Sequence, residues 1–483
     1  MFWRGVVGYL PANLIQGVVG FAAIIAYTRL LTPEDFGRYA LSFSIMTLVH
    51  VVTFSWLEAA MARFWAAQRS PQDLADHFAS LYRTTLRLTL IFVPLVILGG
   101  LYWPMPHDYR LPIIVVLVGI PIRCFAKLAQ ERYRAAGEVA KAARLDIWNT
   151  LAAFAVGVAA AFSGSGATSP MIGLLLAPLF ALPFIFPGEW RQTKGGHVQL
   201  KRLRNYALYG YPIAASLGLA IVLSSTDRFL LAWFLDDAAV GAYHAGYSIA
   251  NRTLDVMFIW LGAAGTPALV MALERGGRED LQIAAKEQAS TLLLIGMPAA
   301  IGLALVARPL AEVLIGENLR HAAILVTPWI ALSALLSGMT VYYFHQAFTL
   351  GQRTGWLLVA MSVPAISNVA LNLILIPYFG IEGAAWATTA SFGIGLLASA
   401  GLGRGILPLP IPWRTIATCG LCCGLMALAL LPLPSIGGLL ELMMDASVGA
   451  LVYGVSAYLL NAGDVRSQIK RLRAYRHVTR AQS

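Results

Sequence analysis

The sequence predicts an all-α polytopic membrane protein with about 14 transmembrane helices. Of the 483 residues, 58% are hydrophobic and only 12% are charged, about half the charged fraction of a typical soluble protein. The mean hydropathy is +0.69, and apolar stretches long enough to cross a bilayer follow one another along almost the entire chain. These stretches are too long for barrel strands and lack their alternating pattern. Because backbone groups inside lipid must be hydrogen-bonded within the segment, the spans are predicted to be helices.

Fourteen spans fit the apolar stretches and the turn signals between them. The first apolar segment starts directly after Arg4 without a small-residue cleavage site, so we interpret it as a retained helix rather than a signal peptide. Turns with typical helix-breaking residues include 32–35, 163–166, 236–237 and 377–380. The predicted spans are 5–28, 37–62, 81–103, 111–135, 141–163, 167–187, 206–234, 241–264, 284–306, 321–346, 355–377, 382–400, 413–433 and 437–460.

The distribution of basic residues predicts the orientation of the chain. With the N-terminus in the cytoplasm, 28 of the 35 Lys and Arg residues fall in cytoplasmic segments and adjoining helix ends, against five on the opposite side. Cytoplasmic loops of membrane proteins carry this excess of positive charge. Both termini are therefore predicted to be cytoplasmic. The same bias explains most of the formal charge of +11, so we expect no nucleic-acid partner.

An internal repeat predicts the domain organisation. Residues 31–60 align with 235–264 at a shift of 204, with 11 identities and no gap, including Gly37 with Gly241 and Trp56 with Trp260. Six helices separate the copies, so both have the same topology, as in parallel repeats related by an axis along the membrane normal. The predicted order is an N-terminal six-helix bundle (1–190), a cytoplasmic linker (191–205), a second six-helix bundle (206–400), two extra transmembrane helices (401–460) and a basic cytoplasmic tail (461–483).

Three segments resemble signature sequences of bacterial polysaccharide exporters. They are residues 28–40 (TRLLTPEDFGRYA), residues 227–231 (DRFLL) with 240–243 (VGAY), and residues 372–388 (NLILIPYFGIEGAAWAT). On these residues and the helix count, the whole chain resembles the O-antigen and polysaccharide flippase family. This family is a branch of the multidrug/oligosaccharidyl-lipid/polysaccharide exporter superfamily.

The resemblance implies a fold, an activity and a location. The fold would have two six-helix bundles around a central cavity, with two extra helices in some members. The activity would be the movement of an undecaprenyl-pyrophosphate-linked oligosaccharide across the bacterial inner membrane for O-antigen, capsule or exopolysaccharide synthesis. The implied partners are the lipid-linked oligosaccharide, the phospholipid bilayer, a polysaccharide polymerase and chain-length machinery.

Ionisable residues at membrane depth are the candidate substrate-binding residues, because they are costly in lipid. Arg123 lies about 13 residues into its predicted span, or roughly 20 Å at 1.5 Å per residue. Further polar residues follow at helical spacing on the same face, namely Lys127, Gln130, Arg134 and Lys141. One reading is a cationic stripe that draws a diphosphate headgroup in from the cytoplasmic surface. The other is positive-inside topology with side chains that extend to the interface.

Five further candidates each allow a structural or a cavity-lining role. Arg252 and Asp255 are three residues apart and can form an ion pair on one helix face. Asp227 and Arg228 lie near the outer end of their span, where a structural role that closes the bundle is favoured. Glu58, deep in the second span, likewise allows a structural or a cavity-lining role.

The remaining features predict neither catalysis nor a cofactor. Cys419 and Cys422 have the spacing of a redox pair but lie in an apolar run, so we interpret them as small helix residues, and no metal site is expected. A membrane-embedded glycosyltransferase or polymerase would need a large periplasmic loop, whereas the longest outer loop, 307–320, is short. A drug/cation antiporter of the same superfamily would need deep acids, and Glu58 is the one good deep acid of the first half. We expect a flippase and not an enzyme. The antiporter and the membrane-embedded enzyme remain open as alternatives.

Overall fold

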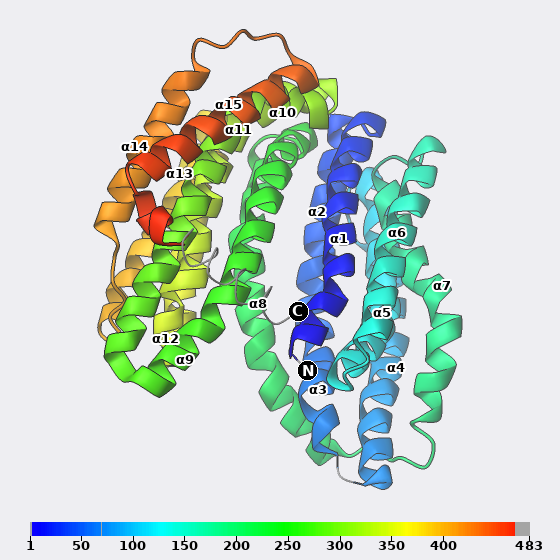
Figure 1. Cartoon of the computed structure of the whole chain (residues 1–483). Coiled ribbons are helices and arrows are strands. Elements are labelled where there is room, and N and C mark those ends of the chain that lie inside the picture. Colours follow the sequence, from blue (N-terminus) through cyan, green and yellow to red (C-terminus); the bar gives the residue numbers. More distant parts are fainter. Residues whose placement is uncertain (1, 69, 469–483) are drawn as a thin grey trace, which may run out of the picture. The chain divides into compact units, whose positions relative to one another are not determined.

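The computed structural model describes residues 2–68 and 70–468, with side chains from residue 11 onward except those of 264 and 354. Every regular element in these residues is a helix (Figure 1). The helices are α1 (Phe2–Leu30), α2 (Pro33–Thr53), α3 (Ser55–Phe64), α4 (Pro71–Tyr102), α5 (His107–Ala135), α6 (Val139–Phe162), α7 (Ser169–Arg191), α8 (Leu200–Phe234), α9 (Asp237–Leu305), α10 (Ala307–Leu314), α11 (Glu317–Met339), the π-helix η3 (Thr340–Phe344), α12 (Gln346–Leu350), α13 (Thr354–Arg404), α14 (Trp413–Leu430) and α15 (Gly438–Leu459). Single 3-10 turns occupy Trp65–Ala67, Gly166–Thr168 and Ala462–Asp464.

The long apolar helices are consistent with the polytopic all-α fold that the sequence predicts. Within the described residues, 12 helical segments are long and apolar enough to span a bilayer. Two of them contain a residue outside helical geometry, Gly277 in α9 (φ 71°) and Gly380 in α13 (φ 59°), a conformation that glycine adopts without steric cost. Dividing α9 and α13 at these glycines yields the fourteen predicted segments, and the all-α polytopic fold class is confirmed.

Several helices begin earlier than predicted. The turn predicted at 32–35 is the first turn of α2, where Thr32 Oγ1 accepts a hydrogen bond from the Asp35 backbone N–H at 3.2 Å and Pro33 follows at the first helical position. Ser70 caps α4 in the same way, at 3.0 Å from Asp73 N, so this helix starts at Pro71 instead of residue 81. Hydropathy detects only the lipid-facing length of a helix and misses such polar first turns.

The predicted single helix over 37–62 is wrong, because the chain bends at Phe54 (φ −123°, ψ −24°) and forms α2 and α3. Side chains that follow the bend donate hydrogen bonds to backbone carbonyl groups that precede it. Ser55 Oγ donates to Val51 O at 2.6 Å, and Trp56 Nε1 donates to Thr53 O at 3.0 Å. Serine hydroxyls that bond back to the preceding turn often bend helices.

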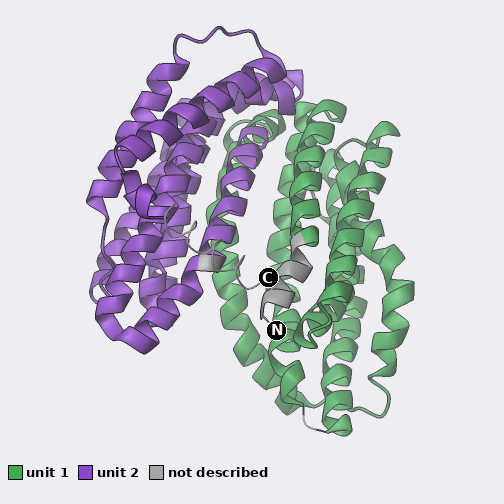
Figure 2. Ribbon diagram, viewed as in Figure 1, with its two compact units in different colours: residues 1–244 green, residues 245–483 purple. Residues whose placement is uncertain are grey.

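The chain forms two compact units, residues 1–244 and 245–483, with the boundary inside α9 (Figure 2). In the first unit, large side chains of α2–α5 and α7 pack into one apolar core that includes Phe54, Leu57, Tyr82 and Ile120. The predicted boundaries at 190, 205 and 400 and the central cavity between two bundles stay predictions.

The repeat is visible in the packing of the first unit, where α2 meets the beginning of α9. A Cβ added at Gly37 would collide with the backbone of Asp237, and a Cβ added at Gly241 would collide with the backbone of Pro33. These residues are equivalent in pairs at the shift of 204, so the contact is reciprocal. Self-complementary contacts of this kind are characteristic of twofold symmetry.

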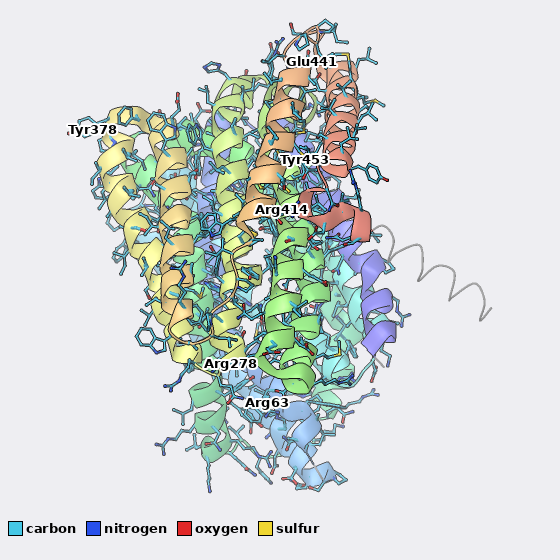
Figure 3. The ribbon with its side chains drawn as sticks, turned by 60° about the vertical axis from the view of Figure 1, so that its left-hand side comes forward. Arg63, Arg278, Tyr378, Arg414, Glu441 and Tyr453 are labelled. Atoms are coloured by element: carbon cyan, nitrogen blue, oxygen red, sulfur yellow. The ribbon has the colours of Figure 1, made fainter. Side chains whose placement is uncertain are left out.

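In the second unit, α14 and α15 pack on each other and on the last part of α9. Cys419, Cys422 and Cys423 are buried free thiols in this core. Tyr453 of α15 donates a hydrogen bond to Leu294 O of α9 at 2.8 Å. Figure 3 shows Tyr453 and Glu441 on α15. Glu441 accepts a hydrogen bond from the Gly437 backbone N–H (2.6 Å), as an acidic residue does at a helix N-terminus.

Candidate functional site: charged residues on α5 and its neighbours

Arg123 lies in α5, about 24 Å along the helix from His107 at 1.5 Å per residue. Its side chain is half-buried in the first unit and makes no hydrogen bond or ion pair within 4 Å to any residue that the structure describes. The carboxylates of Glu58 and Asp146 interact electrostatically with it from neighbouring helices. All the N–H donors of this guanidinium are therefore unengaged by described protein groups.

Glu58 lies in α3, just after the bend at Phe54, with 15% of its side chain exposed. His50 precedes the bend, and its Nε2 lies 3.1 Å from Glu58 Oε1. The pair therefore joins the two sides of the bend. It also places an acidic group within electrostatic range of Arg123.

Lys127 is one turn beyond Arg123 on α5 and is also half-buried. Its ammonium donates to Gln130 Oε1 at 2.9 Å. Its strongest charge interaction is with the like charge of Arg123, and the carboxylates of Asp146 and Glu58 oppose that repulsion. The structure thus brings together three of the predicted site residues, Arg123, Lys127 and Glu58.

Further charged residues complete this cluster toward the end of α5. Arg134 forms ion pairs with Glu131 at 2.8 Å and with Asp146 of α6 at 3.6 Å. Three cations, Arg123, Lys127 and Arg134, thus face three carboxylates, Glu58, Glu131 and Asp146. We call these six residues the α5 charge cluster. Because the ion pairs engage Arg134, the cations left to bind an anion are Arg123 and Lys127.

Two members of the α5 charge cluster, Glu131 and Asp146, and His50, which pairs with Glu58, were not predicted as site residues. Glu131 was detectable, because it lies one turn from Lys127 and next to predicted cationic positions on the same helix. His50 and Asp146 carry no comparable signal, since they join the cluster through contacts between different helices.

A second polar network near the same end of α5 is structural. Glu189 of α7 is buried and accepts hydrogen bonds from Tyr82 Oη at 3.0 Å and from Arg132 Nη2 at 2.6 Å. Arg132 also pairs with Glu138 at 3.0 Å. A hydrogen bond from Lys141, together with the charge of Arg132, holds the pKa of Glu138 below its ordinary value. These bonds join α4, α5 and α7.

Asp227 and Arg228 are buried within the first unit and are engaged by protein groups. Asp227 accepts hydrogen bonds from Tyr243 Oη at 2.5 Å and from its neighbour's backbone N–H at 2.8 Å. Arg228 donates to Ser224 O at 2.8 Å. This geometry joins α8 to the start of α9, as the structural reading of the pair expects.

Arg252 and Asp255 lie in the second unit, on α9, and both are exposed. The ion pair considered for them does not form, because Asp255 Oδ2 instead accepts a hydrogen bond from Asn251 Nδ2 at 2.5 Å. The i, i+4 partner therefore replaces the expected i, i+3 partner. Substrate binding by the predicted residues stays a prediction.

Comparison with known proteins relates this chain to membrane flippases and exporters. It is 21% identical over 456 residues to the probable low-salt glycan biosynthesis flippase Agl15 of Haloferax volcanii, covering 92% of each chain. Its fold is similar to that of the lipid II flippase MurJ in an inward closed conformation, with a TM-score of 0.76, 14% identity, and coverage of 95% of this chain and 99% of that one. It is also similar to a multidrug resistance MATE family transporter in an inward-facing conformation, with a TM-score of 0.63, 16% identity, and coverage of 83% and 97%.

The family model described as polysaccharide biosynthesis protein matches residues 26–324, more than half of the chain. This match includes the α5 charge cluster and two of the three signature segments. The chain is a multi-pass membrane protein that belongs to the polysaccharide biosynthesis protein family.

Proposed function

We propose that this protein is a flippase that moves an undecaprenyl-pyrophosphate-linked oligosaccharide across the bacterial inner membrane for O-antigen, capsule or exopolysaccharide synthesis. Its termini would both be cytoplasmic, and a polysaccharide polymerase with its chain-length machinery would use the exported glycan. Family membership and the similarity to Agl15 support a lipid-linked glycan as the substrate. The residues proposed to bind the diphosphate are Arg123 and Lys127.

The observation that carries this proposal is the unengaged guanidinium of Arg123 at membrane depth. An arginine near the centre of a bilayer costs at least about 2.5 kcal/mol on the most permissive insertion scale. A water-filled route for a polar substrate removes that cost. A diphosphate supplies paired oxygen atoms that match the fork of a guanidinium, whereas an ammonium offers only a point charge.

The test is glycan export in cells that lack the chromosomal copy of the gene. Arg123→Ala removes charge-assisted hydrogen bonds that contribute about 1.5–3 kcal/mol, and the affinity for undecaprenyl diphosphate should fall roughly 10- to 100-fold. Arg123→Lys should retain part of the export. The matched control is Arg144→Ala, an exposed arginine on α6 whose Nε bonds to Ala140 O of its own helix. Full export by Arg123→Ala at normal protein level would contradict the proposal.

A drug/cation antiporter is the second candidate, and the half-buried pair of Glu58 and His50 is the observation that favours it. An antiporter of this kind would extrude a fluorescent organic cation in a Glu58-dependent manner and would leave glycan export unchanged when deleted. A flippase would show the opposite pair of results.

A further inference from the structure

A second polar surface lies in the second unit, on the first part of α9 and on η3. Asp255 is exposed on α9 and bonds to the Asn251 amide at 2.5 Å. Tyr342, from the π-helix η3, lies within electrostatic range of the Asp255 carboxylate. We call Asn251, Asp255 and Tyr342 the α9–η3 polar face.

The position of Tyr342 is determined by packing. Its ring stacks on Phe258 with centroids 6.2 Å apart and an interplanar angle of 6°. A Cβ at Gly262 would overlap this ring, so the absence of a side chain at Gly262 is what lets Tyr342 lie against α9. Gln288 Nε2, from the later part of α9, bonds to the Tyr342 carbonyl at 3.0 Å and joins the π-helix backbone to α9. Single π-helical turns within α-helices occur frequently at functional sites.

The surroundings of this face indicate contact with water. Residues 238–250 and 256–273 on either side of the polar residues contain no Asp, Glu, Lys or Arg, so Asp255 lies in the middle of a long apolar stretch. An exposed carboxylate at such a position would be costly against lipid. Exposed Arg252, on the adjacent face of the same turn, leads to the same conclusion. The helix therefore presents this surface to an aqueous path.

The repeat shows that the polar face is not required for the fold. Asn251, Arg252 and Asp255 correspond to Thr47, Leu48 and Val51 in the first copy of the repeat. The first copy thus forms the equivalent helix without any of these charges.

The chemistry of the face matches the hydroxyl groups of a sugar. A carboxylate accepts hydrogen bonds, an amide both donates and accepts, and a phenol does both, which suits groups that are themselves donors and acceptors. The Asp255 charge would repel a phosphate. A metal ion would need more ligands, and the described residues contain no group of three or more His, Cys, Asp or Glu placed to hold one.

We propose that the α9–η3 polar face binds the glycan of the transported lipid; this inference rests on the proposed function. Within the second unit, these three residues would bind the sugar part of the substrate and not its diphosphate.

The experiment measures equilibrium binding to the full chain in lipid nanodiscs with two probes. One is undecaprenyl diphosphate, and the other is the undecaprenyl-diphosphate-linked glycan extracted from membranes of the source organism. Asp255→Asn and Tyr342→Phe should each weaken binding of the glycosylated probe about tenfold and change binding of undecaprenyl diphosphate less than about twofold. Asp255→Val, which introduces the residue of the first repeat copy, should do the same without loss of folded protein.

The controls use neighbouring residues outside the proposed face. Glu274→Gln changes an exposed acid farther along α9, and Tyr343→Phe removes a hydroxyl that donates to Pro410 O at 2.5 Å. Neither should discriminate between the probes. The inference would be overturned if Asp255→Asn weakened binding of both probes equally, or weakened binding of neither. Equal affinity of the unaltered protein for the two probes would overturn this inference alone, whereas binding of neither probe would overturn the proposed function.

Discussion

The reciprocal contact of Gly37 and Gly241 gives a quantitative prediction about stability. A Cβ at Gly37 would lie 2.8 Å from the Asp237 carbonyl carbon and 3.0 Å from Gly241 N, and one at Gly241 would lie 3.0 Å from Gly37 N. These atoms belong to the backbone, so no side-chain rotation relieves the overlap. The nearest atom to the Gly37 Cβ is the Asp237 carbonyl oxygen, and an ordinary contact of 3.4 Å with it requires a shift of about 1.6 Å. Overpacking typically costs about 1–3 kcal/mol and occasionally more, so we expect a loss of about 3 kcal/mol.

The double variant tests the reciprocity itself. Gly37→Ala and Gly241→Ala each push the same two helix segments apart. Once one substitution has separated the helices, the other should therefore cause a smaller additional loss of stability. The double variant should therefore lose less stability than the sum of the single variants, with a coupling of about 0.5–3 kcal/mol.

The assay is the free energy of unfolding in mild detergent, measured by titration with a denaturing detergent. Gly218→Ala in α8 is the control, because nothing lies within 4 Å of a Cβ at that position. It should be neutral or stabilising by up to about 1 kcal/mol, since alanine favours helix over glycine. A Gly37→Ala protein as stable as the Gly218→Ala protein, or strictly additive losses in the double variant, would refute the reasoning.

Three further predictions concern other parts of the first unit and the topology. Glu189→Leu should cost about 1.5–3 kcal/mol in the same unfolding assay, because it removes the charge-assisted hydrogen bonds from half-buried Arg132, which keeps its ion pair with Glu138. Lys141 and Arg132 lower the pKa of Glu138 in the folded protein. The contribution of Glu138 to stability should therefore be present above about pH 4.5 and be lost as the pH falls through the lowered pKa. Glu138→Gln should flatten this part of the plot of stability against pH, and an unchanged plot would argue against this reasoning. A reporter fused after Ser483 should give a cytoplasmic signal, whereas a periplasmic signal would mean an odd number of spans.

Much of the architecture could be predicted from residue patterns because hydropathy is a local property. The apolar runs revealed fourteen segments, and the glycines at 277 and 380 coincide with breaks expected between runs. Helix starts at Pro33 and Pro71 were misplaced, although the capping residues that determine them are present in the sequence. The bend at Phe54 was missed, because apolar composition continues through it.

The sequence by itself determined the fold class, the repeat and the depth of Arg123, Lys127 and Asp255 along their helices. The fold class and the repeat follow from the order of residue types along the chain. The depth of a residue follows from the fixed rise per residue of a helix, which converts sequence distance into distance along the helix axis. The tertiary structure decided which charges meet. Asp146 reaches Arg123 from another helix, and Asp255 turns to Asn251 instead of Arg252. Such partners depend on the rotation, crossing and rotamers of packed helices, which local composition does not specify.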